Sequence, residues 1–138
     1  MIVFVDTNIW VYAADDTEPH KQAIAQAYLV QMASQNTLAL STQVMQEFFN
    51  VTTGKGKRRL PHEVALGHLE DMSVHMVIES SVQGVLAATS LMQEHKLSWW
   101  DSLILETAIR ANADVLVSED GQAGRKFGKL VVENPFTI

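Results

Sequence analysis

The sequence of 138 residues contains no cysteine, which excludes disulfide bonds and any cysteine-bound metal. Five histidines are present, but no two of them stand four residues apart as in helical zinc motifs. We therefore interpret each histidine as a surface or packing residue. A metal site in this chain would have to use oxygen ligands.

Long hydrophobic runs are also missing. The first apolar segment, Ile2 to Val5, is interrupted by Asp6 and has no basic residues before it, so it does not resemble a signal peptide. No segment approaches the roughly eighteen continuous apolar residues of a membrane span. We expect a soluble, cytoplasmic protein that does not associate with a membrane.

Basic residues are scarce, with 10 lysines and arginines against 16 aspartates and glutamates and a formal charge of −6. Such a charge argues against a protein that coats nucleic acid by bulk electrostatic attraction. It does not exclude a nuclease, because acids gathered around a divalent cation reverse the local field.

The segment at the amino terminus begins with four apolar residues and then changes abruptly to Asp6, Thr7 and Asn8. A short apolar run rich in β-branched residues is typical of a buried parallel strand. Asp6 would then lie at the carboxyl end of that strand, where open α/β sheets bind ligands. Aspartate is also a good helix cap, so the local pattern leaves both roles open.

Predicted strands and helices alternate along the rest of the chain. Parallel strands need crossover helices, so this alternation predicts an α/β fold with a central, mainly parallel sheet of about four to five strands between helical layers. The length favours one domain, residues 1–138. The predicted strands are 2–5, 38–40, 74–78, 115–117 and 130–132, and the predicted helices are 8–14, 19–34, 42–53, 61–72, 82–95 and 99–112.

Four acids are expected to meet at one edge of this sheet. In a right-handed βαβ unit the helix starts beside the carboxyl end of the preceding strand. Asp6 and Asp120 follow strands, whereas Glu47 and Asp101 lie early in helices. Two carboxylates 5 to 6 Å apart repel by roughly 3 kcal/mol, so such a cluster needs compensation. Raised pKa values, basic partners or a bound Mg²⁺ or Mn²⁺ would provide it.

Each acid also has a simpler local interpretation. Ser98 and Asp101 fit a capping box, and Asp120 before Gly121 fits a turn. Glu47 is harder to dismiss, because an unpaired acid beside a core-facing stripe is unfavourable. Glu119 is an alternative to Asp120 as the fourth acid.

Several polar and basic residues could support such a site. Asn8 and Ser118 are placed to orient a carboxylate or water, although both could be turn or cap residues. Lys57, Arg58 and Arg59 form a basic segment that is either a solvated loop or a contact for RNA phosphates.

Taken together, five segments resemble PIN-domain ribonucleases, and within them the VapC toxins of bacterial VapBC toxin-antitoxin pairs. The order and spacing of the segments carry the resemblance, which covers essentially the whole chain. They are residues 5–8 (VDTN), 46–47 (QE), 98–104 (SWWDSLI), 116–120 (LVSED) and 134–136 (NPF).

This resemblance implies an endoribonuclease of α/β/α architecture that needs Mg²⁺ or Mn²⁺ and is inhibited by a cognate antitoxin. It also implies a homodimer, which would bind DNA only through the antitoxin. The implied site consists of Asp6, Glu47, Asp101 and Asp120, with metal ligands among Asp6, Asp101 and Asp120, and with Asn8 and Ser118 in support. The family often has threonine at the position of Ser118.

Other classes of protein fit less well. A receiver-type signalling domain has two adjacent acids after its first strand, where this chain has Thr7 and Asn8. A phosphatase with an aspartate nucleophile would have a second aspartate at Asn8. A catalytically inactive PIN-like binding module remains as the alternative, although all four acids are present.

Overall fold

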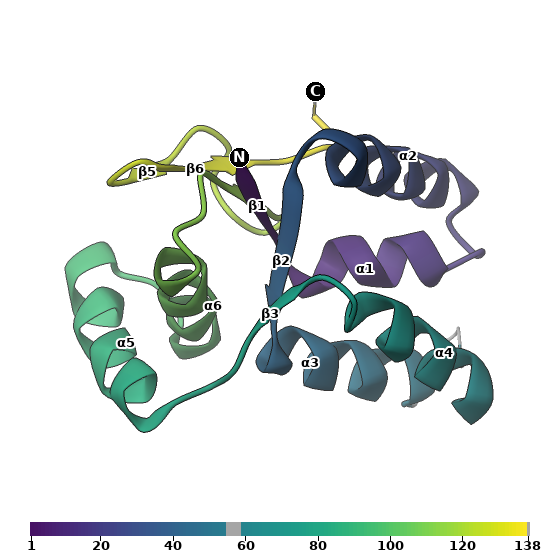
Figure 1. Cartoon of the computed structure of the whole chain (residues 1–138), viewed down its shortest axis with the longest axis horizontal. Helices are drawn as coiled ribbons and strands as arrows, with labels where there is room; N and C mark the ends of the chain where they lie inside the picture. Colours follow the sequence, from purple (N-terminus) through teal and green to yellow (C-terminus); the bar gives the residue numbers. More distant parts are fainter. Residues whose placement is uncertain (55–58, 138) are drawn as a thin grey trace.

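The computed structural model describes residues 1–54 and 59–137 and has a central sheet between two layers of helices (Figure 1). The predicted α/β/α fold is therefore confirmed. The strands are β1 (Ile2–Val5), β2 (Thr37–Ser41), β3 (Met76–Ile78), β4 (Val115–Val117), β5 (Lys126–Phe127) and β6 (Leu130–Glu133). The helices are α1 (Thr7–Ala14), α2 (Pro19–Gln35), α3 (Thr42–Thr53), α4 (His62–Met72), α5 (Val82–His95) and α6 (Trp99–Arg110).

The sheet has the strand order β3-β2-β1-β4-β6-β5, and every neighbouring pair is parallel except β5 and β6. β1 lies in the middle, with Phe4 aligned with Ala39 of β2 on one side and with Leu116 of β4 on the other. The chain first builds outward from β1 to β3 and then returns to add β4 beside β1. This reversal places the carboxyl ends of β1 and β4 next to each other.

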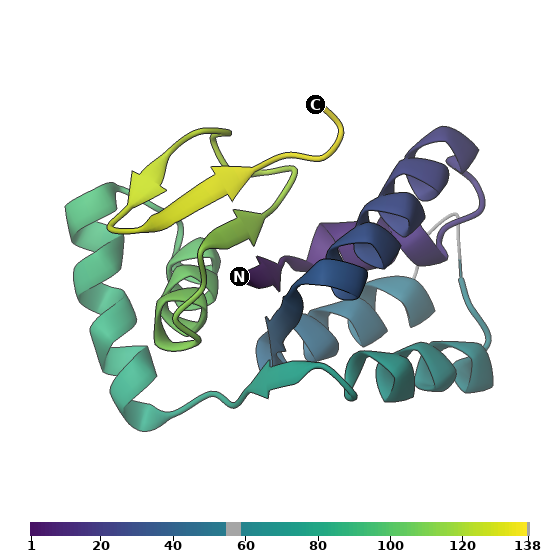
Figure 2. The ribbon, with the colours of Figure 1, turned by 45° about the horizontal axis from the view of Figure 1, so that its top comes forward.

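The helices cover the two faces of the sheet in separate groups. Helices α1 to α4 lie on one face, and α5 and α6 lie together on the other (Figures 1 and 2). This separation follows from the reversal, because right-handed crossovers in opposite directions place their helices on opposite faces. Val3, Phe4 and Val5 are fully buried between the layers, as expected for a continuous apolar strand.

Serine side chains begin three of the helices. Ser41, Ser81 and Ser98 precede α3, α5 and α6, and each hydroxyl accepts a hydrogen bond from a backbone N–H in the first turn at 3.0 to 3.2 Å. Such caps satisfy donors that have no partner inside the helix. The predicted starts of these helices are confirmed.

The sheet has one more strand than the upper end of the predicted range. The additional strand is β5, which was not predicted. It is only two residues long and pairs antiparallel with β6 at the edge of the sheet. Lys126 and Phe127 form no apolar or alternating run, so their pairing depends on the turn that follows at Gly128, whose φ is 64°. β3 is shorter than predicted, because only residues 76–78 pair with β2.

No helix among the described residues is long and apolar enough to cross a membrane.

Candidate active site

Asp6 leaves the carboxyl end of β1 and occupies the N-cap position of α1. One carboxylate oxygen, Oδ1, accepts a hydrogen bond from the Thr7 N–H at 2.7 Å, and Oδ2 accepts one from the Ser118 hydroxyl at 2.8 Å. The same side chain lines a pocket at this edge of the sheet. The two roles left open by the sequence are therefore compatible, because Asp6 caps a helix and still reaches the pocket.

Three further acids line the same pocket, which has a volume of about 320 Å³. Glu47 comes from the middle of α3, Asp101 from the first turn of α6, and Asp120 from the loop after β4. The structure thus brings together the four acids on which the sequence analysis converged. We call them the pocket acids: Asp6, Glu47, Asp101 and Asp120.

As with Asp6 and Ser118, hydrogen bonds from neutral side chains hold two further pocket acids. Glu47 Oε1 accepts a bond from Gln43 Nε2 at 3.0 Å and a long one from the Thr7 hydroxyl at 3.5 Å. Asp120 Oδ2 accepts a bond from Asn8 Nδ2 at 3.0 Å. The sequence analysis did not identify Gln43, although its position four residues before Glu47 on a helix was a usable signal.

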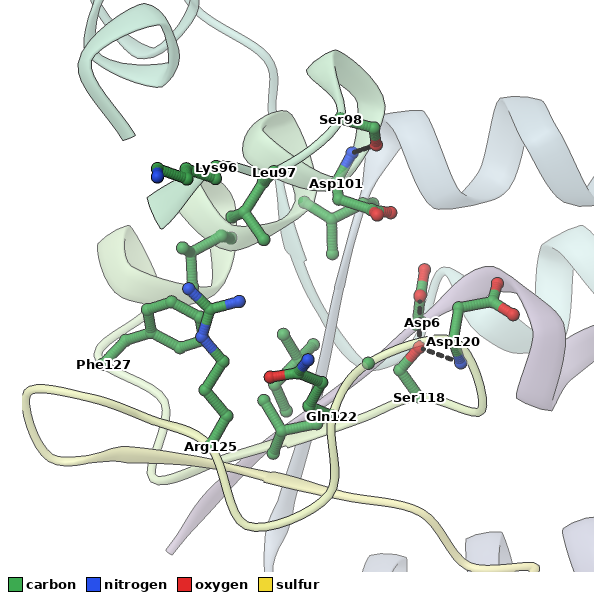
Figure 3. Close-up of a pocket in the computed structure, with 15 residues that line it drawn as sticks. Asp6, Lys96, Leu97, Ser98, Asp101, Ser118, Asp120, Gln122, Arg125 and Phe127 are labelled. Carbon is green, nitrogen blue, oxygen red and sulfur yellow. Dashed lines mark hydrogen bonds between the residues drawn. The ribbon is translucent and has the colours of Figure 1, made fainter. Parts of the chain in front are cut away.

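Ser118 joins the two acids that follow strands. Its hydroxyl donates to Asp6 and accepts from the backbone N–H of Asp120 at 3.2 Å (Figure 3). Asn8 adds a second link, because its Oδ1 accepts the backbone N–H of Glu119 at 3.3 Å. Asn8 and Ser118 therefore lie where the sequence analysis expected supporting polar groups.

Within residues 1–54 and 59–137, no lysine or arginine forms an ion pair with a pocket acid. Burial raises the pKa of Asp6 to about 6, and the nearby carboxylates of Glu47 and Asp101 also raise it, whereas the hydrogen bonds from Ser118 and the Thr7 backbone lower it. Among the described residues, the pocket acids thus have no basic partner, and the raised pKa of Asp6 is what relieves part of their repulsion.

Glu119 lies next to Asp120 in sequence but has a different environment. Its carboxylate accepts a hydrogen bond from Lys21 Nζ at 2.7 Å and one from the Tyr12 hydroxyl at 2.9 Å. The Lys21 ammonium also lies 4.6 Å from the centre of the Tyr12 ring. Glu119 lines no part of the acidic pocket, whereas Asp120 does.

The donor set fits Mg²⁺ or Mn²⁺, because the pocket offers carboxylate oxygens without basic partners. Among the described residues, no three acidic or histidine side chains converge closely enough to hold a metal ion by themselves. Mg²⁺ usually keeps several water ligands and needs only one or two carboxylates, so a hydrated cation would not need three converging side chains.

The basic segment does not contribute to the pocket as far as the structure describes it. Arg59 is exposed and lines neither the acidic pocket nor its neighbour, and Lys57 and Arg58 lie outside the described residues. Trp100, in contrast, lines the acidic pocket and is 62% exposed. Its ring is available for stacking on a base.

A family comparison agrees with this geometry, because a model of the PIN domain matches residues 3–127. The chain belongs to the PIN domain family. No curated protein sequence matches the chain significantly.

Solved structures share this PIN fold over nearly the whole chain. The VapBC2 complex of Rickettsia felis, bound to a DNA fragment from its promoter, includes a chain with 26% identity and a TM-score of 0.70, over 97% of this chain and 98% of that chain. A toxin-antitoxin complex from Klebsiella pneumoniae matches with 22% identity and a TM-score of 0.67, over 94% and 95% of the two chains.

A third structure is Mycobacterium tuberculosis VapC20, a toxin that cleaves the sarcin-ricin loop. It matches with 17% identity and a TM-score of 0.66, over 83% of this chain and 86% of that chain. At this level of identity, the last two comparisons show the fold alone.

Proposed function

We propose that this PIN domain is a metal-dependent endoribonuclease toxin of the VapC type, which hydrolyses RNA phosphodiester bonds and is inhibited by a cognate antitoxin. The observation that carries the proposal is the set of four carboxylates, from four separate elements, that line one pocket and have no basic partner in the part of the chain that the structure describes. A cap or turn role would explain Asp6, Asp101 and Asp120 one by one, but it explains neither Glu47 nor why the four acids meet.

In this proposal Asp6, Asp101 and Asp120 would hold a hydrated Mg²⁺ or Mn²⁺ ion, in part through its water ligands, and Glu47 would complete the site. When bound, such a cation supplies Lewis-acid stabilisation of the charge that develops on the phosphate. Ser118 and the Thr7 N–H orient the Asp6 carboxylate, and Asn8 orients Asp120. Gln43 keeps Glu47 turned toward the pocket.

The proposed partners are an antitoxin protein and a second copy of the chain. The similarity to the Rickettsia felis VapBC2 complex supports the antitoxin, and the net charge of −6 would attract a basic inhibitory segment. DNA contacts would be made through the antitoxin. The homodimer is carried by the family resemblance, and light scattering of the purified chain tests it.

An inactive PIN-like binding module is the alternative function. The retention of all four pocket acids argues against it, because unpaired acids destabilise a fold that does not use them. The receiver-type alternative does not agree with the family match.

The deciding experiment incubates total cellular RNA with the purified protein in Mg²⁺, Mn²⁺ or EDTA and maps the new RNA ends by sequencing. Discrete cuts with Mg²⁺ or Mn²⁺ and none in EDTA are expected. Asp101→Asn should lower the cleavage rate by a factor of about 10² to 10³, as expected when a transition-state charge loses its stabilisation.

Asp101→Asn is a clean variant, because Ser98 binds the backbone N–H of Asp101 and the carboxylate is exposed. The substitution therefore preserves the helix cap. Full cleavage by a correctly folded Asp101→Asn protein, or equal cleavage in EDTA, would contradict the proposed function.

A further inference from the structure

A second pocket opens beside the acidic pocket and shares three of its acids, Asp6, Asp101 and Asp120 (Figure 3). It has a volume of about 250 Å³ and lies between the α5–α6 loop and the segment that leads from β4 to β5. We call it the flanking pocket. Because the two pockets share lining side chains, a chain molecule bound at the acids has the flanking pocket directly beside it.

The flanking pocket has a mixed lining, whose apolar part includes Leu97, Ile104 and Phe127. Proteins that bind single-stranded RNA place unstacked bases against aromatic or apolar side chains and read their edges with polar groups. A paired base could not reach such a surface, because its faces are covered by its neighbours in the helix.

The end of the flanking pocket away from the acids is basic. Lys96 and Arg125 line it and, among the described residues, neither forms an ion pair (Figure 3). Two of the four unpaired basic residues in the described chain therefore line one small pocket of an acidic protein. The four are Arg59, Lys96, Arg125 and Lys126.

Arg125 is held in a fixed orientation. One N–H donates to the His95 carbonyl at 2.8 Å, and the guanidinium lies 4.8 Å from the centre of the Phe127 ring. The guanidinium carries five N–H donors, so several remain for a phosphate or a base. A fixed arginine loses little side-chain entropy when it binds.

Gln122 supplies the group that could distinguish bases. Gln122 lines the flanking pocket and is exposed. Its side-chain amide forms no hydrogen bond with the described residues. An amide presents a donor and an acceptor together, which suits the edge of a base.

We propose that the flanking pocket binds one unpaired nucleotide of the RNA, next to the phosphodiester bond that is cleaved. The base packs on Leu97, Ile104 and Phe127. Lys96 and Arg125 bind the adjoining phosphate, and Gln122 reads the base edge. The inference rests on the proposed function and deepens it, because it assigns a substrate class and a specificity residue to this surface.

Cleavage kinetics of a short single-stranded oligoribonucleotide test the proposal with the full chain in Mn²⁺. Arg125→Ala should raise KM about tenfold, as expected for the loss of one charge-assisted hydrogen bond, and should change kcat much less. Lys126→Ala is the matched control, since it removes the same charge from the next residue, which lies outside the flanking pocket. It should leave KM within about twofold of the parent value.

Gln122→Ala tests base reading. Sequencing of the ends produced from a randomised RNA pool should show that the base preference at one position beside the cut falls at least about fivefold. Arg125→Ala could affect folding through its bond to His95, so circular dichroism and Tm are measured for every variant. Gln122→Ala removes no such bond and keeps the proposal testable.

A binding measurement separates failure of this inference from failure of the proposed function. Fluorescence anisotropy of a labelled single-stranded oligoribonucleotide is recorded with the Asp101→Asn chain and its Arg125→Ala and Gln122→Ala derivatives. Weaker binding by these derivatives supports the pocket, even if the parent protein cleaves no RNA. The proposal would be overturned if Arg125→Ala and Gln122→Ala matched Lys126→Ala in cut sites, KM and RNA affinity. It would also be overturned if these variants lost antitoxin binding but kept RNA binding.

Discussion

Two aspartates at opposite ends of the central strands have opposite environments. Asp114 precedes β4, at the amino end of the strand. Its carboxylate accepts a hydrogen bond from the backbone N–H of Ile2 at 2.8 Å and forms an ion pair with Lys129 at 3.3 Å. The hydrogen bond from the Ile2 backbone has the largest effect on the pKa of Asp114, and it and the contact with Lys129 both lower that pKa. At the carboxyl edge, burial raises the pKa of Asp6 to about 6.

The same contrast extends to the other acids. Outside the pocket, three carboxylates pair with a lysine or arginine, whereas the pocket acids have no basic partner among the described residues. Within residues 1–54 and 59–137, lysine and arginine side chains therefore neutralise acids elsewhere in the fold but pair with none of the pocket acids. The paired acids are Glu106 with Arg110, Glu119 with Lys21 and Asp114 with Lys129.

The largest expected effect comes from neutralising a pocket acid without changing its shape. Glu47→Gln keeps the side chain length, and we expect RNA cleavage to fall by a factor of about 10². Glu70→Gln, an exposed glutamate of α4, is the matched control and should cleave at the parent rate. Initial rates on one oligoribonucleotide decide the comparison. Equal losses in both variants would remove the distinction between pocket acids and other acids.

Removing the partner of a paired acid should instead affect stability. Arg110 donates to Glu106 at 2.8 Å, and the Glu106 side chain is only 10% exposed. Arg110→Ala leaves a nearly buried charge unpaired, so we expect a loss of about 2 kcal/mol in the free energy of unfolding, less than for a fully buried pair. Urea denaturation measures this loss, and a further Glu106→Gln substitution should recover part of it. No recovery would show that Arg110 stabilises the fold through packing rather than charge.

Neutralising Asp6 should stabilise the fold in EDTA. Its pKa is about 6 in the folded protein and near 3.8 when unfolded, so the folded state binds more protons between these values. The parent protein therefore loses stability as the pH rises from about 4 to 6, and Asp6→Asn should not. At pH 7 the variant should be more stable by about 1 kcal/mol, and the gain should vanish below pH 4.

Asp114→Asn is the opposite case at the other edge. The folded pKa of Asp114 is lowered, so its charge stabilises the protein above the unfolded pKa, and that contribution is lost as the pH falls. Asp114→Asn should therefore lower Tm at pH 7 and have little effect in strong acid. If Asp6→Asn and Asp114→Asn shifted Tm in the same direction at pH 7, the two aspartates would not have opposite environments.

The smallest effect is expected for the basic segment, which the sequence leaves open as a solvated loop or a contact for RNA phosphates. Replacing Lys57, Arg58 and Arg59 with alanine should weaken RNA binding severalfold and reduce the slope of log affinity against log salt by about 0.7 for each phosphate that is no longer neutralised. Anisotropy titrations at several salt concentrations measure the slope. An unchanged slope would identify the segment as a solvated loop.

Much of the candidate site could be expected from sequence because strand ends and helix starts have local signals. The apolar run before Asp6, the serine caps at Ser41 and Ser98, and the alternation of elements were enough to place four acids at one sheet edge. The flanking pocket had no such signal. Lys96, Gln122 and Arg125 lie in loops, and their shared surface depends on how the β5–β6 hairpin packs beside α6.

The sequence by itself determined that Asp6 ends a buried strand, since four apolar residues followed directly by Asp, Thr and Asn are typical of a buried strand that ends at a polar loop or helix cap. Only the tertiary structure decided which of two adjacent acids, Glu119 or Asp120, faces the pocket. Local pattern cannot orient neighbouring loop side chains. Here Glu119 is turned away by Lys21, 98 residues distant in sequence, and Asp120 is left with Asn8 at the pocket. That choice depends on contacts that exist only after the sheet and its helices have packed.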